Sequence, residues 1–203
     1  MSTSRIGLFG GTFDPPHIGH LILASEASHQ LNLSKLLWVL TPNPPHKLGQ
    51  PITPVEHRIA MVEQSIAGNS TFHLSRIELD RPGPHYTVDT VNLILKQEPK
   101  SEIVLLIGGD SLKDLPTWKN NVELVSKVHQ IGVMHRPGDT FDHPALFAQI
   151  PGLENKLIFI EALLHTLSSR EIRRRVREKL PYQYYVLPSV HEYIEVNDLY
   201  LSE

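Results

Sequence analysis

The segment that most constrains this 203-residue chain is an apolar run that leads through two glycines into a helical pattern. Residues 5–9 predict a buried strand, and Gly10 and Gly11 allow a tight turn that a ligand can approach closely. Helical spacing follows, so His17 and His20 share a face of the first helical turn. Because free amides and the positive end of the helix dipole meet there, the segment predicts a phosphate site.

Strand-like runs and helical patterns alternate along the rest of the chain. Residues 36–40 and 102–107 are continuous apolar runs, typical of strands covered on both faces. Residues 72–79, 131–134 and 157–160 predict further extended segments. This order predicts an α/β fold: a Rossmann-like, doubly wound, mainly parallel sheet with helices on both faces. We expect one domain over residues 1–203, with a helical C-terminal part from about residue 166.

Capping residues predict where several helices begin. Thr53 is expected to cap a helix that has Pro54 at its first position, and another helix is expected to open at Thr87. Residues 168–171 form a second predicted capping box, whose helix ends before residue 181. The expected buried stripe of that last helix consists of Ile172, Val176 and Leu180.

Composition excludes several classes of protein. The chain has no cysteine, which excludes disulfides, thiolate metal sites and a cysteine nucleophile. Its net charge of −3 gives no case for a nucleic-acid partner or an anionic membrane. Because no segment has the length of a signal peptide or of a membrane span, we expect a cytoplasmic protein. The sequence leaves open whether it forms a homo-oligomer.

The motif around the two glycines differs from two commoner phosphate motifs. It contains neither G-x-x-x-x-G-K-[ST] nor G-x-G-x-x-G, which argues against a P-loop and against an NAD-binding dehydrogenase. With H-x-G-H at residues 17–20, the segment resembles the signature of the nucleotidyltransferase superfamily. That resemblance implies transfer of a nucleotidyl group from ATP or CTP and release of pyrophosphate. The alternative is a structural turn with two surface histidines.

Two later segments extend the resemblance. Residues 168–173 are similar to the C-terminal I-S-S-T-x-I-R signature of that superfamily, and Arg173 falls on its phosphate-binding arginine, whereas Arg170 replaces a usual threonine or serine. Residues 108–111 resemble its I-G-x-D-S motif, in which a carboxylate after a strand can bind ribose hydroxyls. The resemblance implies an ATP site formed by Gly10, Gly11, Thr12, Phe13, His17, Gly19, His20, Gly108, Asp110, Ser168, Ser169 and Arg173.

A second group of motifs narrows the resemblance to the bacterial nicotinate mononucleotide adenylyltransferases. These carry P-N-x-x-P-P-H-K, S-Y-T and P-x-W, which correspond here to residues 42–47, 85–87 and 116–118. Two departures are a proline loop shorter by two residues and His85 in place of serine. The implied mononucleotide site comprises Thr12, Asn43, His46, Lys47, Tyr86, Thr87, Leu112, Trp118 and Arg136. A pyridine ring could stack on Trp118, and the Tyr86–Thr87 amides could receive a carboxylate.

The resemblance implies adenylyl transfer from ATP to nicotinate mononucleotide, giving nicotinate adenine dinucleotide (deamido-NAD) and pyrophosphate, a step of NAD biosynthesis. The implied catalytic residues are His17, His20, Lys47 and Arg173. We expect Mg²⁺ to arrive with ATP and no metal site built by the protein, because no dedicated carboxylate cluster is present. Nicotinamide mononucleotide as the acceptor, dual specificity and a non-catalytic nucleotide sensor are alternatives.

Overall fold

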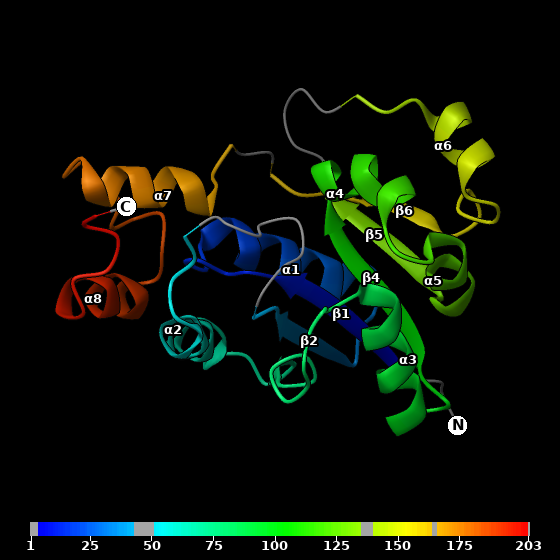
Figure 1. Ribbon diagram of the computed structural model, residues 1–203, viewed down its shortest axis with the longest axis horizontal. Helices are drawn as coiled ribbons and strands as arrows, with labels where there is room; N and C mark the ends of the chain where they lie inside the picture. Colours follow the sequence, from blue (N-terminus) through cyan, green and yellow to red (C-terminus); the bar gives the residue numbers. More distant parts are fainter. Residues whose placement is uncertain (1–3, 43–50, 135–139, 164–165, 203) are drawn as a thin grey trace.

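The computed structural model describes residues 4–42, 51–134, 140–163 and 166–202. Its strands and helices alternate along the chain, as the sequence predicts (Figure 1). The strands are β1 (Arg5–Gly11), β2 (Lys35–Leu40), β3 (Phe72–Ser75), β4 (Glu102–Gly108), β5 (Gln130–Met134) and β6 (Leu157–Ile160). The helices are α1 (Ile18–Gln30), α2 (Val55–Ile66), α3 (Thr87–Gln97), α4 (Gly109–Asp114), α5 (Asn121–Lys127), α6 (His143–Gln149), α7 (Ser169–Arg177) and α8 (Pro188–Val196), with a 3-10 turn η2 (Leu115–Thr117).

The sheet has six strands in the order β3-β2-β1-β4-β5-β6, and every neighbouring pair is parallel. This confirms the predicted doubly wound α/β fold. The order in which successive strands are added to the sheet reverses between β1 and β4, where Phe9 pairs with Leu106. In open sheets of this kind, ligands bind in the crevice beyond the carboxyl ends of the strands at that reversal. The fold therefore places the glycine turn after β1 and residues 108–111 after β4 at one edge.

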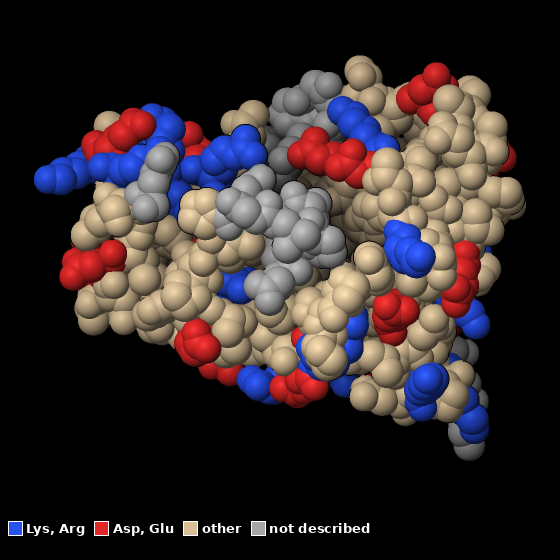
Figure 2. Space-filling model, viewed as in Figure 1, with Lys and Arg blue, Asp and Glu red and all other residues tan. Residues whose placement is uncertain are grey.

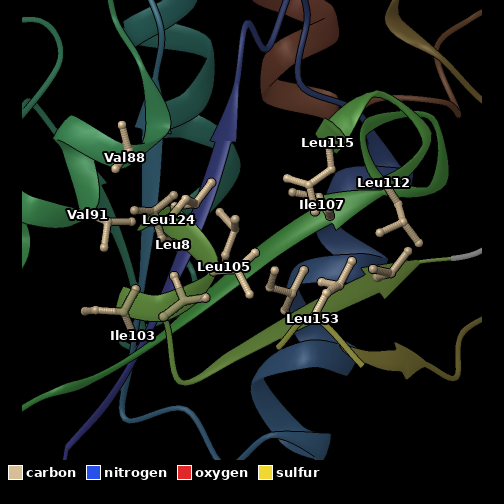
Figure 3. Packing of buried hydrophobic residues seen from close by; sticks show 14 of the residues in the cluster. Leu8, Val88, Val91, Ile103, Leu105, Ile107, Leu112, Leu115, Leu124 and Leu153 are labelled. Atoms are coloured by element: carbon tan, nitrogen blue, oxygen red, sulfur yellow. The ribbon is translucent and has the colours of Figure 1, made fainter. Parts of the chain in front are cut away.

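Apolar side chains cover both faces of the sheet. On one face, α3, α4, α5 and α6 pack over β1, β4 and β5; Figure 3 shows Val91 of α3 beside Leu8 of β1 and Leu124 of α5. On the other face, α1 and α2 cover an aromatic and aliphatic layer that includes Trp38, which is fully buried. A third cluster joins α7 and α8 to Met61 of α2, which attaches the C-terminal helices to the sheet domain.

Three local predictions are wrong. The helix expected at Thr53 begins at Val55, because Pro54 has a non-helical ψ of 142° and its carbonyl accepts the first helical hydrogen bond, from the amide of Arg58. The extended segment 72–79 ends at Ser75, since residues 76–80 fold into a turn closed by a 2.9 Å hydrogen bond from the amide of Asp80 to residue 76. Leu180 is 38% exposed because α7 ends three residues earlier, so helical spacing no longer applies to it.

Candidate active site

Gly10 and Gly11, which the sequence predicts to form a turn, are the last two residues of β1 and pair with β2. The segment over residues 10–17, called the glycine turn here, has one packed side and one open side. Phe13, which is 2% exposed, adopts a positive φ of 49°. Its ring lies against Gly11, where an added Cβ would come within 2.8 Å of the ring. A Cβ added to Gly10, in contrast, would meet nothing within 4 Å. The turn is therefore fixed from inside by an aromatic ring and leaves room for a ligand at Gly10.

The two histidines of the predicted H-x-G-H motif form a stacked pair at the start of α1. His17 is the N-cap residue, and its ring lies 3.7 Å from that of His20, with 26° between the planes. The backbone N–H of His17 donates to Nδ1 of His20 at 3.1 Å. Since Nδ1 accepts, the neutral His20 ring carries its proton on Nε2. The ring of Phe13 meets the ring of His20 edge-on at 5.2 Å and supports this orientation.

Helix α7 brings the predicted C-terminal motif onto the glycine turn. The hydroxyl of Ser168 caps α7 by accepting from the amide of Glu171 at 3.2 Å. Ser169 Oγ donates to the carbonyl of Pro15 at 2.8 Å. Arg173 Nη1 donates to the carbonyl of Asp14 at 2.6 Å and lies 3.9 Å from the Asp14 carboxylate. The structure thus unites two motifs that are more than 150 positions apart in the sequence.

Two other arginines of α7, Arg174 and Arg175, are paired with Glu171 along the helix surface. Figure 2 shows this cluster of basic side chains over α7 at the upper left. Arg174 and Arg175 both donate to Glu171, at 2.7 and 2.9 Å. These contacts, led by the hydrogen bond from Arg174, lower the pKa of Glu171 to about 2. Arg170 is exposed in the first turn of α7. Arg173, in contrast, contacts the glycine turn.

The end of β4 supplies the second part of the predicted ATP site. Continuing the register of Phe9 with Leu106 by two residues brings Gly108 opposite Gly11. A Cβ at Gly108 would meet nothing within 4 Å, so this glycine also borders open space. Asp110 is exposed in the first turn of α4. Leu112, a predicted mononucleotide residue, is 0% exposed, so its side chain belongs to the core and only its main chain can serve a ligand.

The predicted acceptor residues lie at the start of α3. Tyr86 is the N-cap and Thr87 the first residue, and both are half-buried. The first amides of a helix have no acceptor within it and can bind an anion. Beneath them, the buried carboxylate of Glu78 accepts from Thr90 Oγ1 at 2.6 Å, and Arg81 donates to the same hydroxyl at 3.2 Å. Sequence reasoning missed this support.

Other predicted residues lie elsewhere. Trp118 follows η2 and is half-buried, with part of its ring packed against the core cluster under α3 and α5. Thr12 and Gly19 lie in the glycine turn and in α1, at the same edge as the histidines. The predictions for Asn43, His46, Lys47 and Arg136 fall outside the described residues.

Two buried polar residues that the sequence did not single out underlie the site. Arg58 of α2 is 2% exposed, and Asp14 of the glycine turn is 4% exposed. Burial lowers the pKa of Arg58, whereas the carboxylate of Asp14 raises it. The sequence could have indicated that Arg58 is buried. Arg58 lies about one and two helical turns before Val62 and Ile66, so it occupies a position on the buried stripe of α2.

Comparison with known proteins agrees with this geometry. A family model described as cytidylyltransferase-like matches residues 8–175. The chain is 42% identical to a probable nicotinate-nucleotide adenylyltransferase of Thermomicrobium roseum, over 97% of this chain and 92% of that protein. It is 38% identical to the nicotinate-nucleotide adenylyltransferase of Bacillus subtilis, over 98% and 99% of the two chains. The chain belongs to the nicotinate-nucleotide adenylyltransferase family.

Solved structures confirm the fold expected of a nicotinate-nucleotide adenylyltransferase family member. The nicotinic acid mononucleotide adenylyltransferase of Plasmodium falciparum, complexed with NaAD, superposes with a TM-score of 0.82. The alignment covers 98% of each chain at 19% identity. Both the predicted family and the predicted architecture are therefore confirmed.

Two features are absent from the described part of this family member. Within the described ranges, no helix is long and apolar enough to cross a membrane. Over the same part of the chain, no group of three or more His, Asp or Glu side chains is placed to hold a metal ion.

Proposed function

We propose that this protein transfers the adenylyl group of ATP to nicotinate mononucleotide, releasing pyrophosphate and forming nicotinate adenine dinucleotide for NAD biosynthesis. The observation that carries the proposal is the convergence of His17, His20 and Arg173 on the glycine turn at the reversal of the sheet. The names of the relatives support the same reaction. Residues 1–203 would act as one catalytic domain.

The reaction requires positioning and charge stabilisation rather than a covalent intermediate. A 5′-phosphate oxygen of the mononucleotide attacks the α-phosphorus of ATP in line, and the bond from that phosphorus to the β-phosphate oxygen breaks. His20 donates its Nε2 proton in a hydrogen bond to the α-phosphate as charge develops there. His17 and Arg173 bind the other phosphates, and Lys47 is proposed to add positive charge. Mg²⁺ bound to the triphosphate would neutralise charge on the leaving pyrophosphate.

Each substrate has proposed contacts at the ends of β1, β4 and α3. For ATP, Asp110 accepts from the ribose hydroxyls, and Gly10 and Gly108 leave room for the nucleotide. For the acceptor, the first amides of α3 after Tyr86 bind the nicotinate carboxylate, and Trp118 stacks on the pyridine ring. The remaining proposed acceptor contacts are the side chains of Asn43, His46 and Arg136, together with the main chains of Thr12 and Leu112.

Measuring pyrophosphate release with ATP and each mononucleotide tests the proposal. We expect the kcat/KM for nicotinate mononucleotide to exceed that for nicotinamide mononucleotide by at least about tenfold, because amide donors favour a carboxylate over a carboxamide. Equal values would contradict acid specificity. Binding of ATP without any pyrophosphate release would instead favour a nucleotide sensor.

A further inference from the structure

Arg58 makes an unusual set of contacts for a residue near the start of a helix, on its buried face. Its side chain is 2% exposed and donates to four main-chain carbonyls. The Nε atom donates to Thr53 at 2.8 Å, Nη1 to Thr12 at 3.0 Å and Thr41 at 2.9 Å, and Nη2 to Pro42 at 2.8 Å. One guanidinium therefore holds three separate segments of the chain: the glycine turn, the end of β2 and the start of α2.

The burial of this cation has a strict requirement. A guanidinium removed from water is costly unless its N–H groups are bonded and a negative charge lies nearby. The four carbonyls meet the first condition, and the carboxylate of Asp14 contributes the opposing charge. The planar guanidinium presents N–H donors in several fixed directions, so it can bind carbonyls of different chain segments at once. The ammonium of a lysine cannot reproduce this arrangement. The residue thus fits a role in fixing main-chain positions.

Asp14 reinforces the same arrangement from the opposite side. Its Oδ2 accepts from the amide of Thr53 at 3.3 Å, while Arg58 bonds to the carbonyl of Thr53. Its Oδ1 accepts from the hydroxyl of Tyr200 at 2.8 Å, and its carbonyl accepts from Arg173 at 2.6 Å. The end of β2 is also tied directly to the turn, because the amide of Thr41 donates to the carbonyl of Gly11 at 3.0 Å.

We propose that Arg58 is a positioning residue for adenylyl transfer, which fixes the glycine turn on the ATP side relative to the end of β2 on the acceptor side. This inference rests on the proposed function. Arg58 reaches the two sides through main-chain atoms of Thr12 and Thr41, so it needs no contact with either substrate. Its effect is on the alignment of the attacking oxygen with the α-phosphorus.

Alignment and binding respond differently when such a contact is lost. A displacement of about 1 Å between reacting atoms can reduce the rate about 100-fold, even though each substrate keeps its own contacts. We therefore expect Arg58→Lys and Arg58→Gln to lower kcat by about 10- to 100-fold. The dissociation constants for a non-hydrolysable ATP analogue and for nicotinate mononucleotide should change by less than about threefold.

The control must separate positioning from general loss of stability. Ile103 is 1% exposed at the amino end of β4, away from the carboxyl edge, so Ile103→Ala destabilises the fold remotely from the site. Isothermal titration with the ATP analogue counts the competent sites in each preparation, and kcat is expressed per site. Ile103→Ala should keep its kcat per site while its melting temperature falls, whereas the Arg58 variants should lose kcat per site.

A second measurement does not depend on turnover. Amide hydrogen exchange at Thr41 should be faster in Arg58→Lys than in wild type, because the carbonyl of Thr41 is one of the atoms that Arg58 holds. The inference is overturned if the folded Arg58 variants have the same kcat per site as wild type. It is also overturned if neither variant folds, because Arg58 is then required for the fold itself. If the wild-type protein itself shows no adenylyl transfer, the proposed function fails instead. The hydrogen-exchange result then still shows whether Arg58 holds the main chain at Thr41.

Discussion

The backbone N–H of His17 donates to Nδ1 of His20, and the two rings stack with centroids 3.7 Å apart. This contact assigns the acceptor role to Nδ1 and leaves Nε2–H of His20 as a donor. A donor with a fixed direction at the start of a helix is suited to a phosphate oxygen that gains charge during transfer. The N-cap interaction of α1 thereby fixes which nitrogen of His20 can donate.

Replacing His20 tests that assignment. His20→Ala should lower kcat by roughly 100- to 1000-fold, because it removes a hydrogen bond to the transition state. His20→Gln places its amide near the position of Nε2 and should retain more activity than His20→Asn, whose amide lies near the position of Nδ1. Steady-state kinetics on the three purified variants measures both effects. A loss within about threefold for His20→Ala would rule out the donor role.

Arg173 and Arg174 provide a matched pair on the same helix. Arg173→Ala should reduce kcat/KM for ATP by about 10- to 100-fold, since charge-assisted hydrogen bonds to phosphate are lost. Arg174→Ala should stay within about twofold of wild type, because its guanidinium is bonded to Glu171 along the helix surface. Initial rates at varied ATP concentration measure both. Equal losses in the two variants would show that the basic helix acts only through its overall charge.

Asp110 is expected to bind the ribose of ATP. Asp110→Asn should raise the KM for ATP by about tenfold while kcat changes little, because the ribose contact is similar in the ground state and in the transition state. Asp114, four residues later and also exposed, is the control, and Asp114→Asn should leave the KM unchanged. An unaltered KM for ATP in Asp110→Asn would show that Asp110 does not bind the ribose.

His85 should make stability depend on pH. Burial lowers the pKa of His85 from 6.5, although Glu78 raises it. Between the lowered value and 6.5, the unfolded chain binds a proton that the folded protein does not, so the free energy of unfolding falls as pH decreases through that window. Denaturant unfolding from pH 7 to pH 5 should show a weaker pH dependence for His85→Ser.

The control for this pH dependence is His73, which is exposed on β3. His73→Ser should keep the wild-type pH dependence of the unfolding free energy. Identical profiles for His85→Ser and wild type would show that the buried imidazole does not contribute to it. The comparison also tests a position where this chain departs from the serine of the bacterial enzymes it resembles.

The sequence predicts the elements of this fold better than their arrangement. Continuous apolar runs identify β2 and β4, because strands buried on both faces carry no polar alternation. The strand order does not follow from these runs, since periodicity shows which residues are buried but not which strands are neighbours. The reversal between β1 and β4, which locates the site, therefore required the structure.

The sequence likewise predicts some of the candidate site residues and misses others. Sequence motifs indicated His17, His20 and Arg173. The two histidines share a face at the start of a helix, where phosphate binds, and residues 168–173 resemble a phosphate-binding signature. Arg58 and Glu78 act through main-chain carbonyls and a buried hydroxyl, and such partners leave no local pattern in the sequence. The sequence distinguishes Arg58 only as a charged residue on an apolar helix stripe. That position does not show which carbonyls the guanidinium binds.

The attachment of α7 and Tyr200 to the glycine turn has a consequence for biosynthesis. Asp14 and Tyr200 are separated by 186 positions, so the ribosome must add that many residues before their contact can form. At translation rates of about 5–20 residues per second, this interval lasts roughly 10 to 40 s. Until then, the carboxylate of Asp14 lacks its hydrogen bond from Tyr200. The proposed phosphate contact of Arg173 likewise requires synthesis to continue at least 159 residues beyond Asp14, and a polypeptide terminated before Arg173 lacks it.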